Sequence, residues 1–570
     1  MSAPPTEVSG TQIERETRFS ESVVWALQRQ YYGGRGPAAW HSGEVPSYAT
    51  CNTFIAKSYA EAVLVYLTDA RAAGQIDPAH PVYIVELAAG VGRFAFQFLC
   101  KWRQLFQESA IADLDVRYVM TDFVDHNPRV WAAHPHLAPF VATGTLCFGV
   151  FDVETAKEIE LLDGAGVLSA ATVHNPMVVL GNYAFDTFTM DLFKFGGGEA
   201  REVRISVRAP AGVNPAAPRL PELLFRYTDH PIEGTYYEDP ALERTLAAYR
   251  ETLSGTMISI PIGGLRGLRT LLEMSRNRLL LLTSDKGFIQ HDELYHRQQH
   301  AMQFHGDGFS MMVNFHAIAS YLAECGGWSM GTARRTLNLR TLAGVVGGDG
   351  PAFGSTRVHL RELMEFGPGE FFELYQTTRR GPPQTLPQFL GLLRLSGYDP
   401  QMLCEFAGTL RELVTGLDEI AQFDVRVALD RAWRNYYPGP VNMPFELARI
   451  YMVMKRPVEA ARFYQISLDW FGETPATRFN LGICYYYAER PADALVEFRR
   501  ALELAPDFQG AHEWISRLKA EAELGLGGPE RHVAPTSRAP VVTLATNPEG
   551  IEAGGAKTAA AEGKSAARVA

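Results

Sequence analysis

Residues 82–93 read VYIVELAAGVGR, and this stretch decides the fold of the N-terminal part of the chain. A short apolar run ends at the acid Glu86, and a turn with Gly90 and Gly92 then leads into a helical pattern from Phe94. A buried strand that passes through a glycine turn into a helix is the first unit of a nucleotide-type α/β fold. The glycines allow close approach of a ligand, and the helix start offers free N–H groups.

This glycine turn differs from the turns that bind phosphates. Ala88 stands where the first glycine of G-x-G-x-x-G would be, and the Lys-Ser/Thr pair of a P-loop is missing. The acid Glu86 at the end of the strand instead suits a ligand that carries positive charge and hydroxyl groups. A tight strand–helix turn without any ligand is the alternative, because such turns are common.

Three further apolar segments end in polar residues, as strands do at the ligand-binding edge of an open α/β sheet. These segments are residues 115–123, 145–154 and 176–186. The polar residues at or after their ends are Asp122, Asp152, Asn182, Tyr183 and Asp186. A carboxylate at the end of the second strand can accept both ribose hydroxyls of a nucleoside. Any one of these acids could be a surface residue or a helix cap, Asp186 included, but four strands in order favour a shared site.

Together these features resemble motif I and the following strands of the S-adenosylmethionine (SAM) methyltransferases. The resemblance implies that the Gly90–Gly92 turn lies against the methionine part of SAM and that Glu86 contacts its amino group. It also implies that Asp152 holds the adenine amino group. The cofactor-binding residues expected on this basis are Glu86, Ala88, Gly90, Gly92, Asp122, Asp152 and Asn182.

A closer resemblance covers roughly residues 45–345. Residues 181–207 are similar to the segment after the fourth strand of the MidA-like SAM methyltransferases, where a β-hairpin insertion follows. Residues 278–288 resemble the fifth strand of that family, and residues 306–328 resemble its segment that leads into a helix. Members of this family are linked to methylation of protein side chains, arginine included.

The sequence departs from the family pattern where the methyl acceptor would bind. Asn182 and Asp186 fit the pattern, but Tyr183 replaces a glutamate, which is the natural bidentate partner of a guanidinium group. Residues 48–67 keep only the character of a helix that could lie over the cofactor. We therefore expect Asn182, Tyr183 and Asp186 to position the acceptor, and the identity of the acceptor stays open.

Four histidines fall within one short polar stretch and invite a metal-binding interpretation. They lack the glutamate of H-E-x-x-H, which favours a solvated helix or loop at the edge of the site, with no metal. His305 precedes a glycine turn and could lie close to the substrate. The four are His291, His296, His300 and His305.

The composition excludes several classes of protein. The chain has 570 residues, 46% hydrophobic and 21% charged, as in soluble globular proteins of several domains. A net charge of −11 without a basic stripe argues against a nucleic-acid partner. The six cysteines are scattered, as in a reduced cytoplasmic protein. Because we find neither a signal peptide nor an apolar run of membrane-spanning length, we expect a cytoplasmic protein without a membrane partner.

The C-terminal third contains an internal repeat with a period of about 34 residues. Small and aromatic residues of residues 474–507 follow the spacing of a tetratricopeptide (TPR) repeat, and the same places are filled one period earlier. Residues 511–524 would form the capping helix that such stacks need. Because stable stacks usually need more helix pairs, we expect helices within residues 401–437 to pack on the repeats. A plain helical bundle is the alternative.

Shifts in composition divide the chain into five expected segments. They are a disordered N-terminus (1–15), a SAM-methyltransferase domain (16–345, with an insertion at about 193–270), a helical connecting region (357–440), TPR repeats with a capping helix (441–524) and a disordered tail (525–570).

The fold class expected is therefore α/β, a class I SAM-methyltransferase Rossmann-like sheet followed by an all-α TPR domain. The leading hypothesis is methyl transfer from SAM to a protein side chain, with the acceptor recruited by the TPR helices. One alternative is a small-molecule or peptide natural-product methyltransferase whose repeats serve homodimerisation. Another is a scaffold that keeps the SAM fold without catalysis. Methyl transfer requires alignment of the acceptor and, where needed, removal of a proton.

Overall fold

The computed structural model describes residues 10–36, 48–297 and 302–523. The chain forms two compact units, of which the first ends at Thr377 and the second begins at Thr378. Among the described residues, no helix combines the length and the apolar character needed to cross a membrane.

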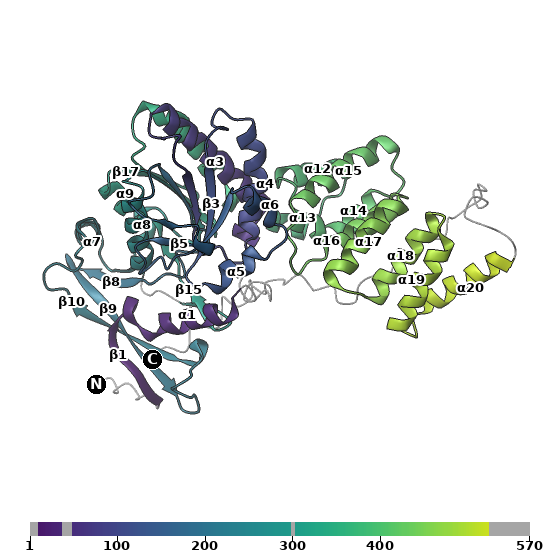
Figure 1. Cartoon of the computed structure of the whole chain (residues 1–570). Helices are drawn as coiled ribbons and strands as arrows, with labels where there is room; N and C mark the ends of the chain where they lie inside the picture. The colour runs from purple at the N-terminus through teal and green to yellow at the C-terminus, as the bar shows by residue number, and fades with distance from the viewer. Residues whose placement is uncertain (1–9, 37–47, 298–301, 524–570) are drawn as a thin grey trace. The chain divides into compact units, whose positions relative to one another are not determined.

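A nine-stranded sheet forms the centre of the first unit, in the order β17-β18-β12-β7-β2-β3-β4-β5-β6 (Figure 1). Its five central strands are parallel and buried, and they are β2 (Val82–Glu86), β3 (Val116–Asp122), β4 (Leu146–Val150), β7 (Met177–Leu180) and β12 (Leu279–Asp285). The antiparallel edge strands are β5 (Ile159–Leu161), β6 (Val167–Leu168), β17 (Gly327–Gly331) and β18 (Arg340–Val346). Continuous apolar runs suit parallel strands that are covered on both faces. The predicted α/β class and the five predicted strands are confirmed.

The order of the strands creates a switch point beside β2. The chain passes from β2 to β3 and β4 on one side, and then returns to pair β7 with the other side of β2. Ligands of open α/β sheets bind in the crevice outside the carboxyl ends of the strands at such a point.

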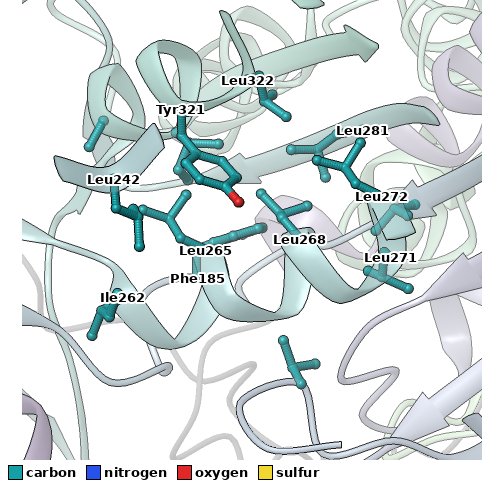
Figure 2. Close-up of a cluster of buried hydrophobic side chains, with 14 of the residues drawn as sticks. Phe185, Leu242, Ile262, Leu265, Leu268, Leu271, Leu272, Leu281, Tyr321 and Leu322 are labelled. Atoms are coloured by element: carbon teal, nitrogen blue, oxygen red, sulfur yellow. The ribbon is translucent and has the colours of Figure 1, made fainter. Parts of the chain in front are cut away.

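Helices cover both faces of this sheet (Figure 1). One face carries α3 (Thr53–Ala72) and α4 (Arg93–Gln107), and the other carries α8 (Ile262–Met274) and α9 (Phe315–Glu324). Figure 2 shows the leucines of α8 packed with Leu281 of β12 and with Tyr321 and Leu322 of α9. This buried apolar layer fixes α8 against the strands whose ends carry the site.

A second, smaller sheet contains the insertion and the N-terminal strand. Its strands are β1 (Gly10–Arg18), β8 (Asp191–Gly196), β9 (Glu199–Pro210), β10 (Leu224–Pro231) and β11 (Thr256–Ile260). Residues 10–15, expected to be disordered from their polar composition, belong to β1, because their backbone pairs with β9. Arg18 then donates from Nε to Asp191 Oδ1 at 2.8 Å. Residues 1–9 lie outside the described residues.

The first unit extends beyond the glycine-rich segment that was expected to end it. Two helices follow that segment, α10 (Gly354–Glu365) and α11 (Pro368–Arg380). The backbone N–H and the hydroxyl of Thr356 both donate to Asp69 of α3 at 2.8 Å, and Phe371 stacks on Phe54. The expected domain end at residue 345 is therefore too early, because these long-range contacts hold residues 354–377 on α3.

The second unit is all-helical. Its helices are α12 (Leu386–Leu395), α13 (Pro400–Glu405), α14 (Ala407–Leu413), α15 (Glu419–Arg434), α16 (Met443–Val453), α17 (Pro457–Phe471), α18 (Pro475–Tyr487), α19 (Pro491–Leu504) and α20 (Gln509–Glu523). Arg411 of α14 pairs with Glu446 of α16, so the helices before the repeats pack on them, as predicted. The expected connecting region 357–440 is thus divided between the two units. The expected tail, residues 525–570, lies outside the described residues.

The predicted repeat geometry is confirmed at the contact between α18 and α19. A Cβ atom on Gly482 would lie 2.7 Å from the ring of Phe498, so only glycine permits this approach. Phe498 also stacks on Trp514 of α20, with ring centroids 5.7 Å apart. The helix after the repeats therefore closes their apolar core.

Replacement of this glycine should weaken the second unit alone. We expect Gly482→Leu to destabilise it by about 1–3 kcal/mol, because overpacking forces the two helices apart. The matched control is Gly391→Ala in α12, where an added Cβ meets nothing within 4 Å. Calorimetry of the full chain should show a lower unfolding temperature of the second unit for the leucine variant and an unchanged unfolding temperature of the first unit. Equal unfolding temperatures of the second unit in the two variants would contradict this packing.

Candidate functional site

A cavity of about 170 Å³ lies at the carboxyl edge of the central sheet. On this measure a single water needs roughly 10–15 Å³, so the cavity has room for a larger ligand. The expected site residues that line it are Glu86, Ala88, Gly90, Asp122, Asp152, Asn182, Tyr183 and Asp186. Gly92 does not line it and instead forms the N-cap of α4, with φ of 80°. The structure thus brings together residues from the ends of four strands.

The turn after β2 keeps three residues in the left-handed backbone region. The φ angles are 51° at Ala88, 56° at Gly90 and 80° at Gly92. This conformation is strained for alanine, and such strain persists only where surrounding contacts hold it. Those contacts are present, since Ala89 N–H donates to Thr121 O at 3.1 Å and Trp131 Nε1 donates to Gly90 O at 2.9 Å. The turn is therefore fixed before any ligand binds.

Glu86 ends β2 and is 6% exposed. Its Oε2 atom accepts a hydrogen bond from the hydroxyl of Tyr118 at 3.0 Å. Burial raises the pKa of Glu86 from 4.5 to about 8, and the hydrogen bond from Tyr118 opposes this rise only in part. A buried carboxyl of this kind is stabilised in its charged form by a cation, so Glu86 can hold an ammonium group.

Asp122 ends β3 beside Glu86 and is also buried. Its Oδ2 atom accepts from Asn127 Nδ2 at 2.8 Å, and its Oδ1 atom accepts from Val124 N–H at 3.4 Å. Burial raises the pKa of Asp122. Each carboxyl oxygen has a second lone pair, so both can still accept hydroxyl groups of a ligand.

Asp152 is already paired. Arg29 donates to its Oδ1 and Oδ2 atoms at 3.3 and 2.6 Å, and the guanidinium lies 4.6 Å from the centre of the Phe123 ring. A ligand amino group would have to compete with Arg29 for this carboxylate. Arg29 was not among the site residues expected from the sequence, because it belongs to a helix that lies 123 residues before Asp152 in the chain.

That helix is α1 (Val23–Arg35), which places four side chains in the cavity wall: Trp25, Gln28, Arg29 and Tyr32. Gln28 is buried and donates to Thr187 O at 3.1 Å while it accepts from Phe309 N–H at 3.2 Å. The glutamine therefore holds α1 in place over the cavity. No local sequence pattern indicates this role, because the partners of Gln28 lie at residues 187 and 309.

Asn182 ties three elements together at the end of β7. Its Oδ1 atom accepts from the Tyr59 hydroxyl of α3 and from Ser284 N–H of β12, both at 3.1 Å. Its Nδ2 atom donates to Thr50 O at 3.4 Å. The helix expected within residues 48–67 is present as α3, but the cavity wall takes Thr50 and Cys51, which precede it, and no residue of α3. Because these bonds occupy the asparagine oxygen, the acceptor-positioning role assigned from sequence fits Tyr183 and Asp186 better.

Tyr183 has a φ angle of 46°, which a bulky residue rarely adopts. Its N–H donates to Ser284 O at 3.0 Å, so β12 fixes this backbone. Strain of this kind costs about 1–3 kcal/mol and is concentrated at functional sites. The structure therefore presents the tyrosine to the cavity from a fixed position.

Asp186 does not cap a helix, because the next described element after it is strand β8. It instead forms a carboxyl pair with Asp285 at the end of β12. Asp285 Oδ2 accepts from Asp186 N–H at 3.1 Å, and Asp285 Oδ1 accepts from Lys286 N–H at 2.7 Å. Burial raises the pKa of both acids, so the pair retains a proton near neutral pH.

The histidine stretch separates in space. His305, at the end of β14 (Gln303–His305), lines the cavity and lies 3.2 Å from Ser310 Oγ, measured from Nε2. His291 lies 2.9 Å from Thr252 Oγ1, away from the cavity wall, and His300 lies outside the described residues. In the described part of the chain, no group of three His, Cys, Asp or Glu side chains could hold a metal ion.

Acids outnumber bases in the cavity wall. The lining acids are Glu86, Asp122, Asp152, Glu154 and Asp186, and the lining Lys and Arg residues are Arg29 and Lys286. An acid-rich wall of this kind favours a ligand with positive charge over a phosphate-rich one.

Comparisons with known proteins match separate parts of the chain. Residues 475–508 match the family model of the tetratricopeptide repeat. No match was found among curated proteins. Among solved structures, the chain is similar to an uncharacterized protein from Burkholderia thailandensis, with 16% identity and a TM-score of 0.34, over 59% of this chain and 94% of that one. A second structure, of the same superfamily and organism and bound to S-adenosyl-homocysteine, has 16% identity and a TM-score of 0.33, over 58% and 93% of the two chains.

The raised pKa of Glu86 gives a pH dependence that can be measured without any ligand. Between 4.5 and about 8 the folded chain keeps Glu86 protonated while the unfolded chain ionises it, so stability falls as pH rises through this window. We expect Glu86→Gln to remove this loss, and to gain roughly 3–4 kcal/mol over wild type between pH 5 and pH 8. Urea unfolding at pH 5 and at pH 8 measures this difference in the free energy of unfolding. The exposed Glu108→Gln is the control, and parallel curves for wild type and Glu86→Gln would refute the assignment.

Proposed function

We propose that this protein is a SAM-dependent methyltransferase that binds its methyl donor in the cavity at the carboxyl edge of the central sheet. The observation that carries the proposal is the arrangement at the switch point. Two buried carboxyls, Glu86 and Asp122, end adjacent strands next to a left-handed turn in an acid-rich wall. A ligand with an ammonium group, a sulfonium group and ribose hydroxyls fits these groups together.

Each part of the wall suits one part of the donor. Glu86 and the turn through Gly90 would hold the amino-acid end, and Asp122 would accept the ribose hydroxyls. The aromatic rings of Phe123 and Phe151 offer flat apolar walls for adenine. When bound, SAM supplies an electrophilic methyl group on its sulfonium.

The remaining residues would act on the acceptor. Helix α1 forms one wall of the cavity and is anchored there by Gln28. Tyr183, held by β12, limits the space beside Asp186. Asp186 lies in a carboxyl pair whose pKa values are raised by burial, so it can take a proton from the acceptor near neutral pH. Alignment and proton removal are the two contributions that methyl transfer needs from the protein.

The acceptor, on this proposal, is a protein side chain that the second unit recruits. TPR helices commonly bind extended or helical segments of partner proteins. The charged side chains of the repeats pair with one another, as Arg478 does with Glu473 and Glu497, which favours a structural and binding role. A small-molecule acceptor and a non-catalytic scaffold remain as the competing hypotheses.

Binding of S-adenosylhomocysteine (SAH), the product form of the donor, tests the site. We expect SAH at 100 times its dissociation constant to stabilise the wild-type first unit by about 2.7 kcal/mol. Gly90→Val should abolish this shift, because a branched side chain would meet the ligand at a left-handed position. Gly144→Val is the matched control: it has a φ of 72° and open space around it, outside the cavity. Wild-type affinity in the Gly90 variant, measured by titration calorimetry, would refute the donor site.

Removal of the second unit tests recruitment. We expect residues 1–381 to keep SAH affinity, since the first unit contains every cavity residue and ends at Thr377. Transfer of labelled methyl groups from SAM to proteins of a cell lysate should fall at the same time. Label confined to small molecules would favour the small-molecule hypothesis, and SAH binding without any label would favour the scaffold. Equal protein labelling by full-length and shortened chains would contradict recruitment by the repeats.

A further inference from the structure

One end of the cavity carries a cluster that the donor site leaves unused. Asp186 is its centre, with Asp285 behind it. Tyr32 of α1 and Tyr183, in the segment after β7, line the cavity together with Asp186. Burial, and after it the charge of Asp186, raises the pKa of the Tyr32 hydroxyl. Burial, followed by the charges of Asp285 and Asp186, raises the pKa of the Tyr183 hydroxyl.

Lys286 adds a cation to this cluster. It follows β12 directly and lines the cavity. Its ammonium group acts on Asp186 and, after burial, lowers the pKa of His305. Lys286 Nζ also donates to Oε1 of Gln303, a residue outside the cavity lining, at 3.4 Å.

The hydrogen bonds of the cluster limit what Asp186 can accept. Both Asp285 oxygens already accept backbone N–H groups, and the two carboxyls are hydrogen-bonded to each other. Among the described residues, Oδ1 of Asp186 is buried and meets no N–H or O–H partner, so it can accept a hydrogen bond from a ligand. One oxygen of Asp186 is then left for a ligand. A group with a single donor hydrogen fits this site.

The charges and hydrogen bonds of the cluster exclude a guanidinium group, which is the acceptor that its acids alone would favour. A guanidinium presents five N–H donors in a rigid fork and seeks a bidentate carboxylate, which one free oxygen cannot provide. The Lys286 ammonium would also repel a cationic acceptor. The same ammonium stabilises negative charge on an acceptor oxygen as its proton leaves.

We propose, as a deepening of the proposed function on which it rests, that this end of the cavity binds a phenolic hydroxyl and that the enzyme methylates its oxygen. Tyr32 and Tyr183 provide the aromatic walls for the ring. The hydroxyl gives its proton to the Asp186 carboxylate, and its oxygen lone pair forms the new bond to the methyl carbon. The bond between that carbon and sulfur breaks, with its electron pair left on sulfur. The products are a methyl ether and SAH, and the proton on Asp186 returns to solvent.

The binding test uses 4-nitrophenol, whose phenolate absorbs visible light and whose neutral form does not. We expect the full chain with SAH to bind this probe below neutral pH and to raise its phenolate absorbance. Lys286→Met should weaken that binding by on the order of tenfold, the size of one charge-assisted hydrogen bond, and Lys286→Arg should retain it. Lys194→Met is the matched control, because Lys194 pairs with Asp229 on the second sheet, away from the cavity.

The transfer test separates acceptors and their sources. With labelled SAM, we expect label in phenol or in N-acetyltyrosinamide, and none in benzylamine or methylguanidine. Label in phenol alone indicates a small-molecule source, whereas label in the tyrosine derivative as well indicates a protein side chain. SAH binding without a phenolate signal, or with methylation of the amine or the guanidine, overturns the phenol inference and leaves the donor site intact. If the chain does not bind SAH, both the proposed function and this inference are wrong.

Discussion

The pairing of β2 with both β3 and β7 is the constraint on which the rest of the first unit depends. It sets the carboxyl ends of β2, β3 and β7 side by side, so that Glu86, Asp122 and Asn182 meet at one edge. Backbone hydrogen bonds of parallel strands fix this spacing independently of the side chains. The cost is the burial of several carboxyls, which raises their pKa values and makes them respond to a ligand.

The layers around the sheet support the strand ends that form the cavity wall. The apolar contacts of α8 hold β12 in register, and β12 in turn positions Tyr183 and Asp285. Tyr59 of α3 and Gln28 of α1 contribute hydrogen bonds that tie their helices to Asn182 and to the backbone of Thr187. Such a preorganised site needs little rearrangement before chemistry, which is the main source of catalytic stabilisation in enzymes.

The cavity separates two kinds of group along its length. The strand ends at Glu86 and Asp122 suit a ligand with an ammonium group and ribose hydroxyls, whereas Asp186, Lys286 and Tyr183 form a mixed charged and aromatic end. A donor and an acceptor that meet between them would be held by different elements. The described residues that line this wall all belong to the first unit.

The sequence by itself determined the α/β class, the five parallel strands and the TPR helix pairs, because these follow from local apolar periodicity and from glycine turns. It also pointed to the cavity residues at the strand ends, such as Glu86 and Asp122, since parallel strands end at a common edge. Tertiary structure alone decided the rest. Arg29 pairs with Asp152, Asp285 joins Asp186, and residues 354–377 belong to the first unit because Thr356 binds Asp69. Each of these contacts joins residues far apart in the chain, and no local pattern encodes which partners folding brings together.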